Sequence, residues 1–227
     1  DGTLCDGKSL GVADAELLDR ALAEAGGSGS ARETITVSGL EVRPYPHQER
    51  ILEALDVARV VHDRHRNLVV AATGTGKTVI AALDYKDLCT RANKRLRLLF
   101  VAHRKEILRQ ARDTFRHALL DGAFGELLCD GETPERGEHV FASIQLAAGL
   151  IDRLGAAHFE HVIIDECHHT PAASYQAVLE RIAPRVLVGL TATPERSDGR
   201  SLLPDFDGRI AAELRLWSAL DQQLLCP

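Results

Sequence analysis

Short apolar runs alternate with helix-like segments through most of this chain, and this alternation constrains the fold more than any other feature. Strands are predicted at 68–71, 98–101, 162–164 and 186–190, with weaker ones near 126–129 and 139–142. Helices are predicted over 47–63, 77–90, 104–119 and 172–183. Strands that are apolar throughout are typical of a parallel sheet covered by helices on both faces, so we expect an α/β fold.

The size and composition of the chain suit one α/β domain with a small appendage. The 227 residues are 45% hydrophobic and 26% charged, which is ordinary for a globular protein. No apolar run approaches the roughly 18 residues of a membrane helix, and no signal peptide is visible, so we expect no membrane partner. The cysteines are odd in number and lack a C-x-x-C pair, which suits reduced thiols and a cytoplasmic location. They are Cys5, Cys89, Cys129, Cys167 and Cys226.

Residues 1–33 differ from the rest of the chain. They hold seven acidic against three basic side chains, a balance of −4 out of the total net charge of −6. A short helix is predicted over 13–25, and the composition of 26–30 is that of a flexible linker. Because the chain starts at Asp1 without a methionine, we expect it to be a piece of a longer protein.

A glycine-rich loop lies between the predicted strand 68–71 and the predicted helix 77–90. The N–H groups of such a loop, with the positive end of the helix, bind phosphate oxygens. Lys77 can reach the terminal phosphates of ATP, and the Thr78 hydroxyl can ligate Mg²⁺. The pattern G-x-x-x-x-G-K-[ST] has glycine where this chain has Ala71. A turn that binds nothing is the alternative, and the strand–turn–helix context counts against it. The predicted ATP-binding residues are Thr73, Gly74, Thr75, Gly76, Lys77 and Thr78.

An acidic pair, Asp165 and Glu166, follows the predicted strand 162–164. Open α/β sheets bind ligands at the carboxyl ends of their strands. Asp165 would therefore hold Mg²⁺ through its water shell, while Glu166 would orient or deprotonate the attacking water. Two solvated acids at a strand end are the alternative, and the phosphate loop upstream counts against it. With Lys77 these residues form the predicted catalytic set, with ATP and Mg²⁺ as cofactors.

Two further elements surround the acidic pair. The run Cys167-His168-His169 could suggest zinc, but the sequence offers no second ligand cluster at suitable spacing. A structural or signal-relaying role for His168 is therefore favoured. Thr191 and Thr193 follow the predicted strand 186–190, where their hydroxyls could hydrogen-bond the acidic pair. We expect His168, Thr191 and Thr193 to couple the ATP site to a neighbouring site.

In this order, the motifs resemble the first motor domain of superfamily 2 helicases and translocases, over about residues 40–200. The residues of these motifs are most similar to those of bacterial DEAD/DEAH-like helicases related to restriction-enzyme motor subunits and excision-repair helicases. Some of these carry a phospholipase D-like nuclease domain. The resemblance implies a RecA-like P-loop domain over 34–204, after a helical segment and linker over 1–33. Residues 205–227, with a helix around 211–220, would lead to a second RecA-like domain of the same chain, which supplies an arginine finger.

The resemblance also assigns binding residues. The run 43–48 resembles the glutamine motif, in which Gln48 would read adenine; an exposed residue at a helix start is the alternative. The runs 101–104 and 141–145 resemble motifs that touch the nucleic-acid backbone, which implies such contacts for Arg104, Ser143 and Gln145. A stripe of basic residues on the predicted helix 104–119 either binds phosphates or is a solvated face. It consists of Lys105, Arg109, Arg112 and Arg116.

The resemblance makes an ATP-dependent DNA helicase or translocase the leading functional interpretation, with DNA favoured over RNA as the partner. The alternatives are an RNA helicase and an ATP-gated nucleic-acid-binding module that does not unwind. The net charge of −6 argues against attraction of the whole surface to nucleic acid, but it is compatible with a local basic groove.

Overall fold

The computed structural model describes residues 42–167, 172–195, 199 and 201–214. The chain divides into two units, 1–34 and 35–227, and the described residues all belong to the second unit. The helix predicted over 13–25 and the linker after it lie outside the described residues. No helix in the described part of the chain is long and apolar enough to cross a membrane.

The described residues form a seven-stranded sheet in the order β3-β4-β2-β5-β6-β1-β7. Every strand pairing in it is parallel, and the α/β prediction is confirmed. The strands are β1 Arg66–Ala71, β2 Leu98–Ala102, β3 Glu126–Leu128, β4 His139–Ser143, β5 His161–Asp165, β6 Val186–Thr191 and β7 Ile210–Leu214.

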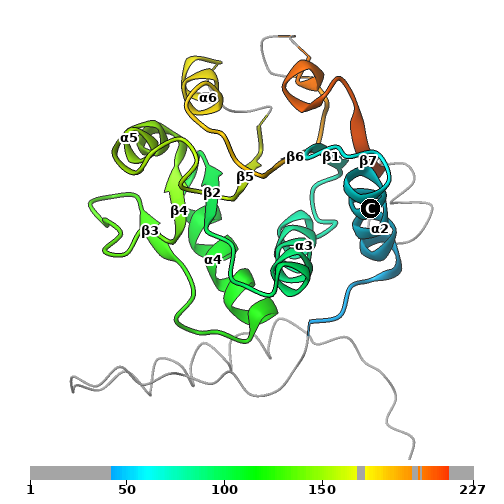
Figure 1. Cartoon of the computed structure of the whole chain (residues 1–227), viewed down its shortest axis with the longest axis horizontal. Coiled ribbons are helices and arrows are strands. Elements are labelled where there is room, and N and C mark those ends of the chain that lie inside the picture. Colours follow the sequence, from blue (N-terminus) through cyan, green and yellow to red (C-terminus); the bar gives the residue numbers. More distant parts are fainter. Residues whose placement is uncertain (1–41, 168–171, 196–198, 200, 215–227) are drawn as a thin grey trace, which may run out of the picture. The chain divides into compact units, whose positions relative to one another are not determined.

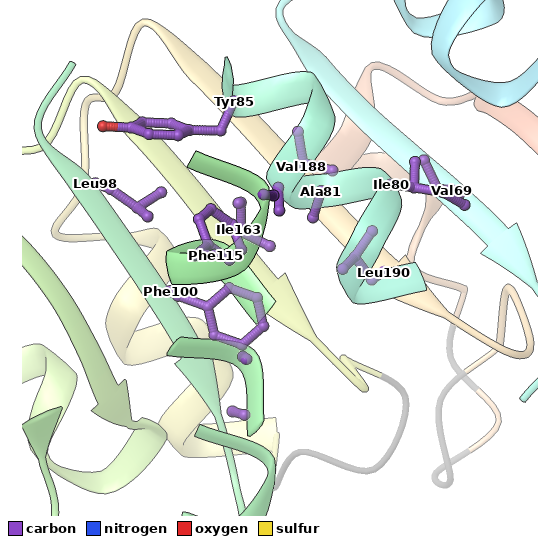
Figure 2. Close-up of a cluster of buried hydrophobic side chains, with 14 of the residues drawn as sticks. Val69, Ile80, Ala81, Tyr85, Leu98, Phe100, Phe115, Ile163, Val188 and Leu190 are labelled. Atoms are coloured by element: carbon purple, nitrogen blue, oxygen red, sulfur yellow. The ribbon is translucent and has the colours of Figure 1, made fainter. Parts of the chain in front are cut away.

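Helices cover both faces of the sheet, as the uniformly apolar strands predicted (Figure 1). They are α2 Pro46–Val60, α3 Lys77–Ala92, α4 Lys105–Leu119, α5 Ile144–Leu154, α6 Ala172–Leu179 and the 3₁₀ helix η1 Leu203–Phe206. One buried cluster packs the sheet against α2, α3 and α4, and a second packs it against α5, α6 and η1. Figure 2 shows the first cluster, in which Tyr85 and Phe115 lie over the side chains of β2 and β5.

One helix was missed. Residues 144–154 form α5, directly after β4, with Ile144, Ala147 and Ile151 buried. Their i, i+3, i+7 spacing is the signal that would have found this helix. The strand and the motif 141–145 run into it without a turn, and Gly149 in its middle weakens the helical pattern.

Two other helix predictions need correction. The helix expected over 172–183 ends at Leu179, and a turn follows in which the Arg181 N–H donates to the Val178 carbonyl at 3.1 Å. The helix expected around 211–220 is wrong for its first part, since β7 lies there; residues 215–220 lie outside the described residues. The backbone of β7 pairs with β1, so a hydrogen-bonding partner outweighs the local helix propensity of its alanines and leucine.

Packing in the core also explains why position 189 is a glycine. A Cβ at Gly189, in the middle of β6, would lie 2.4 Å from Cζ of Phe206. The ring of Phe206 is fully buried and packs η1 onto the sheet. Gly189 therefore lets η1 approach β6, the strand that ends at Thr191 on the carboxyl edge.

Candidate functional site

The central strands bring the predicted catalytic residues to one edge of the sheet. Strand β6 lies between β1 and β5. Val70 of β1 pairs with Thr191, and Asp165 of β5 pairs with Leu190. Since the strands are parallel, the glycine-rich loop, Thr191 and the acidic pair all lie at the carboxyl edge. This is where an open α/β sheet binds its ligands.

The glycine-rich loop is held in shape by its own residues. Gly74 and Gly76 have left-handed backbones, with φ of 87° and 78°. The Thr75 hydroxyl donates to the Ala72 carbonyl at 2.7 Å. Helix α3 begins at Lys77, and it has no acidic residue in its first turn. The free N–H groups of this first turn therefore have no acidic side chain beside them on the helix, as a phosphate-binding site requires.

Lys77 is buried and lies between the loop and the acidic pair. Its Nζ donates to the Ala71 carbonyl at 3.2 Å and lies 3.5 Å from Glu166 Oε1. Ala71 ends β1 within the strand and is not left-handed. A glycine is therefore not required at this position, which accounts for the departure from the phosphate-loop pattern.

The acidic pair combines burial with local backbone strain. Asp165 is 4% exposed, and burial, with the charge of Glu166, raises the pKa of its carboxyl to about 6. Glu166 has a left-handed φ of 50°, and its N–H donates to Asp165 Oδ1 at 2.9 Å. Left-handed backbone at a residue other than glycine is sparsely populated, and it concentrates at functional sites.

Residues on β6 link the acidic pair to the loop that follows this strand. The Cys167 thiol donates to the Leu190 carbonyl at 3.5 Å, and burial raises its pKa to about 12. The Thr191 hydroxyl donates to the Thr193 carbonyl at 2.6 Å. Thr193 in turn donates to the Glu195 carbonyl at 3.1 Å. The predicted coupling residue His168 lies outside the described residues.

The donor set suits Mg²⁺ and ATP. Thr78 at the start of α3 and Asp165 offer the hydroxyl and carboxylate oxygens that Mg²⁺ prefers. In the described part of the chain, no group of three or more His, Cys, Asp or Glu side chains could hold a metal ion by itself. A magnesium ion here would therefore share its coordination with phosphate and water, as this metal usually does.

Gln48, at the start of α2, contacts the phosphate loop. It is 3% exposed, so the alternative of an exposed helix-start residue is wrong. Its Nε2 donates to the Thr75 carbonyl at 3.2 Å, while its Oε1 accepts the Tyr45 N–H at 3.0 Å. A Cβ at Gly76 would lie 2.4 Å from Gln48 Nε2, so this glycine permits the contact. Adenine recognition by Gln48 stays a prediction.

His47 is a further residue of this site, which the sequence motifs did not identify. His47 is buried, and its Nε2 lies 3.1 Å from the Thr75 carbonyl, the oxygen that Gln48 also contacts. The two neighbouring side chains therefore anchor the same point of the loop. The signal was present in the motif itself, since His47 directly precedes Gln48.

The residues predicted to bind nucleic acid lie further along the same edge. Strand β2 pairs with β4 so that Ala102 faces Ser143 at their carboxyl ends. Arg104 occupies the N-cap position of α4 and Ser143 that of α5, and neither side chain makes a capping hydrogen bond. Arg104 and Gln145 are exposed, and Ser143 is half-buried. All three thus lie at or after the carboxyl ends of β2 and β4, on the same edge as the predicted ATP site, while their contact with nucleic acid stays a prediction.

The basic stripe of α4 divides into two pairs. Arg112 and Arg116 are half-buried, with side chains 21% and 26% exposed. Arg116 donates to the Phe124 carbonyl at 2.8 Å, which is a structural role. Lys105 and Arg109 remain at the surface, where they form ion pairs with Asp130 and Glu132.

Comparisons with known proteins agree with this geometry. The chain is 28% identical over 189 residues to irc3 of Schizosaccharomyces pombe, whose name describes a mitochondrial ATP-dependent helicase; 74% of this chain and 28% of irc3 are covered. It is 30% identical over 135 residues to the DNA 3'-5' translocase XPB2 of Sulfurisphaera tokodaii, covering 60% of this chain and 28% of XPB2. The chain thus spans little more than a quarter of each relative.

A solved structure shares the fold. A nuclease-deletion mutant of the Type ISP restriction-modification enzyme LlaGI, in complex with a DNA substrate mimic, superposes with a TM-score of 0.63 at 15% identity, covering 81% of this chain and 21% of that chain. The RecA-like architecture is therefore confirmed. Residues 41–196, more than half of the chain, match the family ResIII, described as the res subunit of type III restriction enzymes. The chain belongs to the ResIII family.

Proposed function

We propose that this chain is the N-terminal ATP-binding motor domain of an ATP-dependent DNA helicase or translocase. The observation that carries the proposal is the convergence of Lys77, Glu166 and Thr191 from three neighbouring strands at one edge. Lys77 Nζ lies 3.5 Å from Glu166 Oε1, so the loop and the acidic pair already form a single site.

Each residue has a role that follows from its position. The loop N–H groups and Lys77 bind the phosphates, and Thr78 and Asp165 hold Mg²⁺. Magnesium, when bound, neutralises charge on the β- and γ-phosphates. Glu166 orients or deprotonates the attacking water. Its carboxylate lies 3.5 Å from Lys77 Nζ, so it would compete with the γ-phosphate for this cation.

We also propose that this domain works with a second RecA-like domain of the same protein. The domain proper would cover 34–204 together with β7, after an N-terminal segment over 1–33. The second domain would close the ATP cleft and supply an arginine finger, which is worth about 10³–10⁵ in rate. Without it, this chain binds ATP weakly and hydrolyses it slowly. Thr191 and Thr193 would couple the opening and closing of the ATP cleft to the nucleic-acid surface.

DNA is the preferred polymer in this proposal. The name of XPB2 and the DNA bound to LlaGI favour it, but both observations belong to those proteins. A cytoplasmic location is part of the proposal; the three cysteines in the described part of the chain, Cys89, Cys129 and Cys167, are free thiols. The mitochondrial name of irc3 leaves an organelle as the competing location.

Stimulation of ATP hydrolysis tests the function. Phosphate release by the whole protein would be measured alone, with single-stranded DNA and with RNA of the same sequence. We expect DNA to raise the rate at least about tenfold, and more than RNA does. Stronger stimulation by RNA would favour the RNA helicase. ATP binding without stimulated turnover would favour an ATP-gated binding module, and no ATP binding would overturn the proposal.

A further inference from the structure

A tight turn after β3 carries two acidic side chains beside the predicted nucleic-acid edge. Asp130 and Gly131 both have left-handed backbones, with φ of 48° and 85°. The turn closes with the Glu132 N–H donating to the Cys129 carbonyl at 2.8 Å. We call residues 129–132 the acidic turn. The backbone of this turn is thus closed on itself, and it carries Asp130 and Glu132.

The acidic turn neutralises the first two cations of α4. Lys105 Nζ lies 2.8 Å from Asp130 Oδ2, and Arg109 Nη2 lies 3.0 Å from Glu132 Oε1. The two cations are four residues apart, so they lie on one face of the helix. All four side chains are about half exposed. These ion pairs are therefore open to solvent and to competing anions.

The acidic turn lies on the same edge as the proposed nucleic-acid surface. It follows β3, α4 follows β2, and both strands are parallel to β4. The carboxyl ends of the three strands therefore point the same way, and Arg104 directly precedes Lys105. A phosphate backbone that contacts Arg104 would pass beside Lys105 and Arg109.

Energetics favour exchange at these ion pairs over permanent pairing. Exposed ion pairs contribute little to stability, because solvent and salt screen them. A nucleic-acid phosphate that pairs with the same cation also releases a condensed counterion, which favours the new pair at low salt. An arginine can bind a phosphate through two parallel hydrogen bonds. The acidic turn thus holds these cations weakly enough for phosphates to replace it.

We propose that Lys105 and Arg109 extend the nucleic-acid surface, and that backbone phosphates displace Asp130 and Glu132 as their partners. The partner is a single-stranded nucleic acid recognised through its phosphates. The inference rests on the proposed function and goes beyond it, because it names two further contacts and a built-in competitor. The competitor lowers affinity for any polyanion at the edge, and it excludes short anions that cannot displace both carboxylates together.

The experiment measures the binding of a labelled single-stranded oligodeoxythymidine to this chain at several salt concentrations. The Asp130→Asn/Glu132→Gln variant removes the competitor while keeping shape, since asparagine tolerates the left-handed backbone. Its affinity should rise about fivefold. The Lys105→Ala/Arg109→Ala variant should bind more weakly than wild type, and its log–log salt slope should fall by about two units.

A matched control separates local exchange from net charge. Asp56→Asn/Asp87→Asn changes the charge equally and also releases an exposed arginine, Arg91. Arg91 lies in the last turn of α3, away from the carboxyl edge. This control should change affinity by less than about twofold.

Two results would overturn the inference: an acidic-turn variant that binds like the control variant, or a wild-type salt slope that survives loss of Lys105 and Arg109. Arg104→Ala separates this failure from failure of the proposed function. If Arg104→Ala weakens binding while the acidic-turn variant matches the control, only the inference fails. If the wild-type chain does not bind the oligonucleotide at low salt, the proposed nucleic-acid surface fails as well.

Discussion

The proposed ATP site and the proposed nucleic-acid surface share one edge of the sheet but differ in how far their side chains are exposed to solvent. At the carboxyl ends of β1 and β5, Lys77 and Asp165 are buried, at 8% and 4% exposed, and Glu166 is partly buried. At β2 and β4, Arg104 and Gln145 are exposed. Phosphoryl transfer is accelerated by fixed charges in a water-poor site. Contact with a polymer backbone needs cations that reach solvent and can exchange partners.

The buried half of the edge therefore carries a stability cost that the exposed half does not. Asp165 is desolvated beside a second carboxylate, and Glu166 has a strained backbone. Exposed pairs such as Lys105–Asp130 contribute little either way. If this contrast is right, substitutions in the two halves should separate in size and in kind.

The largest effect is expected for Glu166→Gln. This change keeps Asp165 and Lys77 but removes the carboxylate that we propose activates water, so the turnover of ATP should fall by about 10²–10⁴. The affinity for Mg·ATP should stay within a few-fold of wild type. Nucleotide binding and phosphate release by the whole protein measure the two quantities, with exposed Glu138→Gln as control. Turnover near the wild-type rate would show that Glu166 is not the catalytic carboxylate.

A smaller effect is expected for Asp165→Asn, and it is a gain in the stability of the fold. The folded pKa of about 6 lies above the ordinary 3.8. The stability contributed by the protonated carboxyl is therefore fully present below about pH 4, and it is lost as pH rises through 6. At pH 7.5, without added nucleotide, the free energy of unfolding of the variant should exceed that of the wild type by about 3 kcal/mol.

Denaturant unfolding at pH 4 and pH 7.5 checks this prediction. The gain for Asp165→Asn should vanish at pH 4, and exposed Asp152→Asn should show no comparable gain at either pH. A destabilised Asp165→Asn at pH 7.5 would mean that the carboxylate is well solvated or paired in the ligand-free chain, against the contrast drawn above.

The smallest effect is expected for Arg104→Ala. Loss of one backbone contact should lower the affinity for single-stranded DNA several-fold and reduce the log–log salt slope by about one unit. Two oligonucleotides of unrelated sequence should lose affinity alike, because phosphate contacts carry no base information. A loss confined to one sequence would place Arg104 against a base instead of the backbone.

The sequence predicted the buried half of the edge better than the exposed half. Strand β1, the loop and Asp165 follow one another locally, so apolar runs and motif spacing identify them. The contacts that decide the exposed half are not local. Asp130 and Glu132 reach Lys105 and Arg109 across more than twenty residues of sequence, and no periodicity predicts such pairs.

Long-range pairing also explains the remaining differences. Strand β7 has a helix-forming composition, but the edge of β1 gives its backbone a partner. His47 joins the phosphate loop only because α2 lies beside it, through a contact with Thr75 that spans 28 positions. The sequence shows which residues are available, while the packing of α2 and β7 decides which of them meet.

The most direct test of the account measures phosphate release by the whole protein against the concentration of single-stranded DNA. Lys77→Ala should lower turnover at least about 100-fold at every DNA concentration, because it removes the buried charge at the phosphates. Arg104→Ala should reach the wild-type maximum but need several-fold more DNA. Exposed Lys94→Ala, at the opposite edge, is the control and should match wild type. Two results would contradict the division of the edge into a chemical half and a binding half. One is turnover at the wild-type rate by Lys77→Ala. The other is a lowered maximal rate for Arg104→Ala with an unchanged DNA requirement.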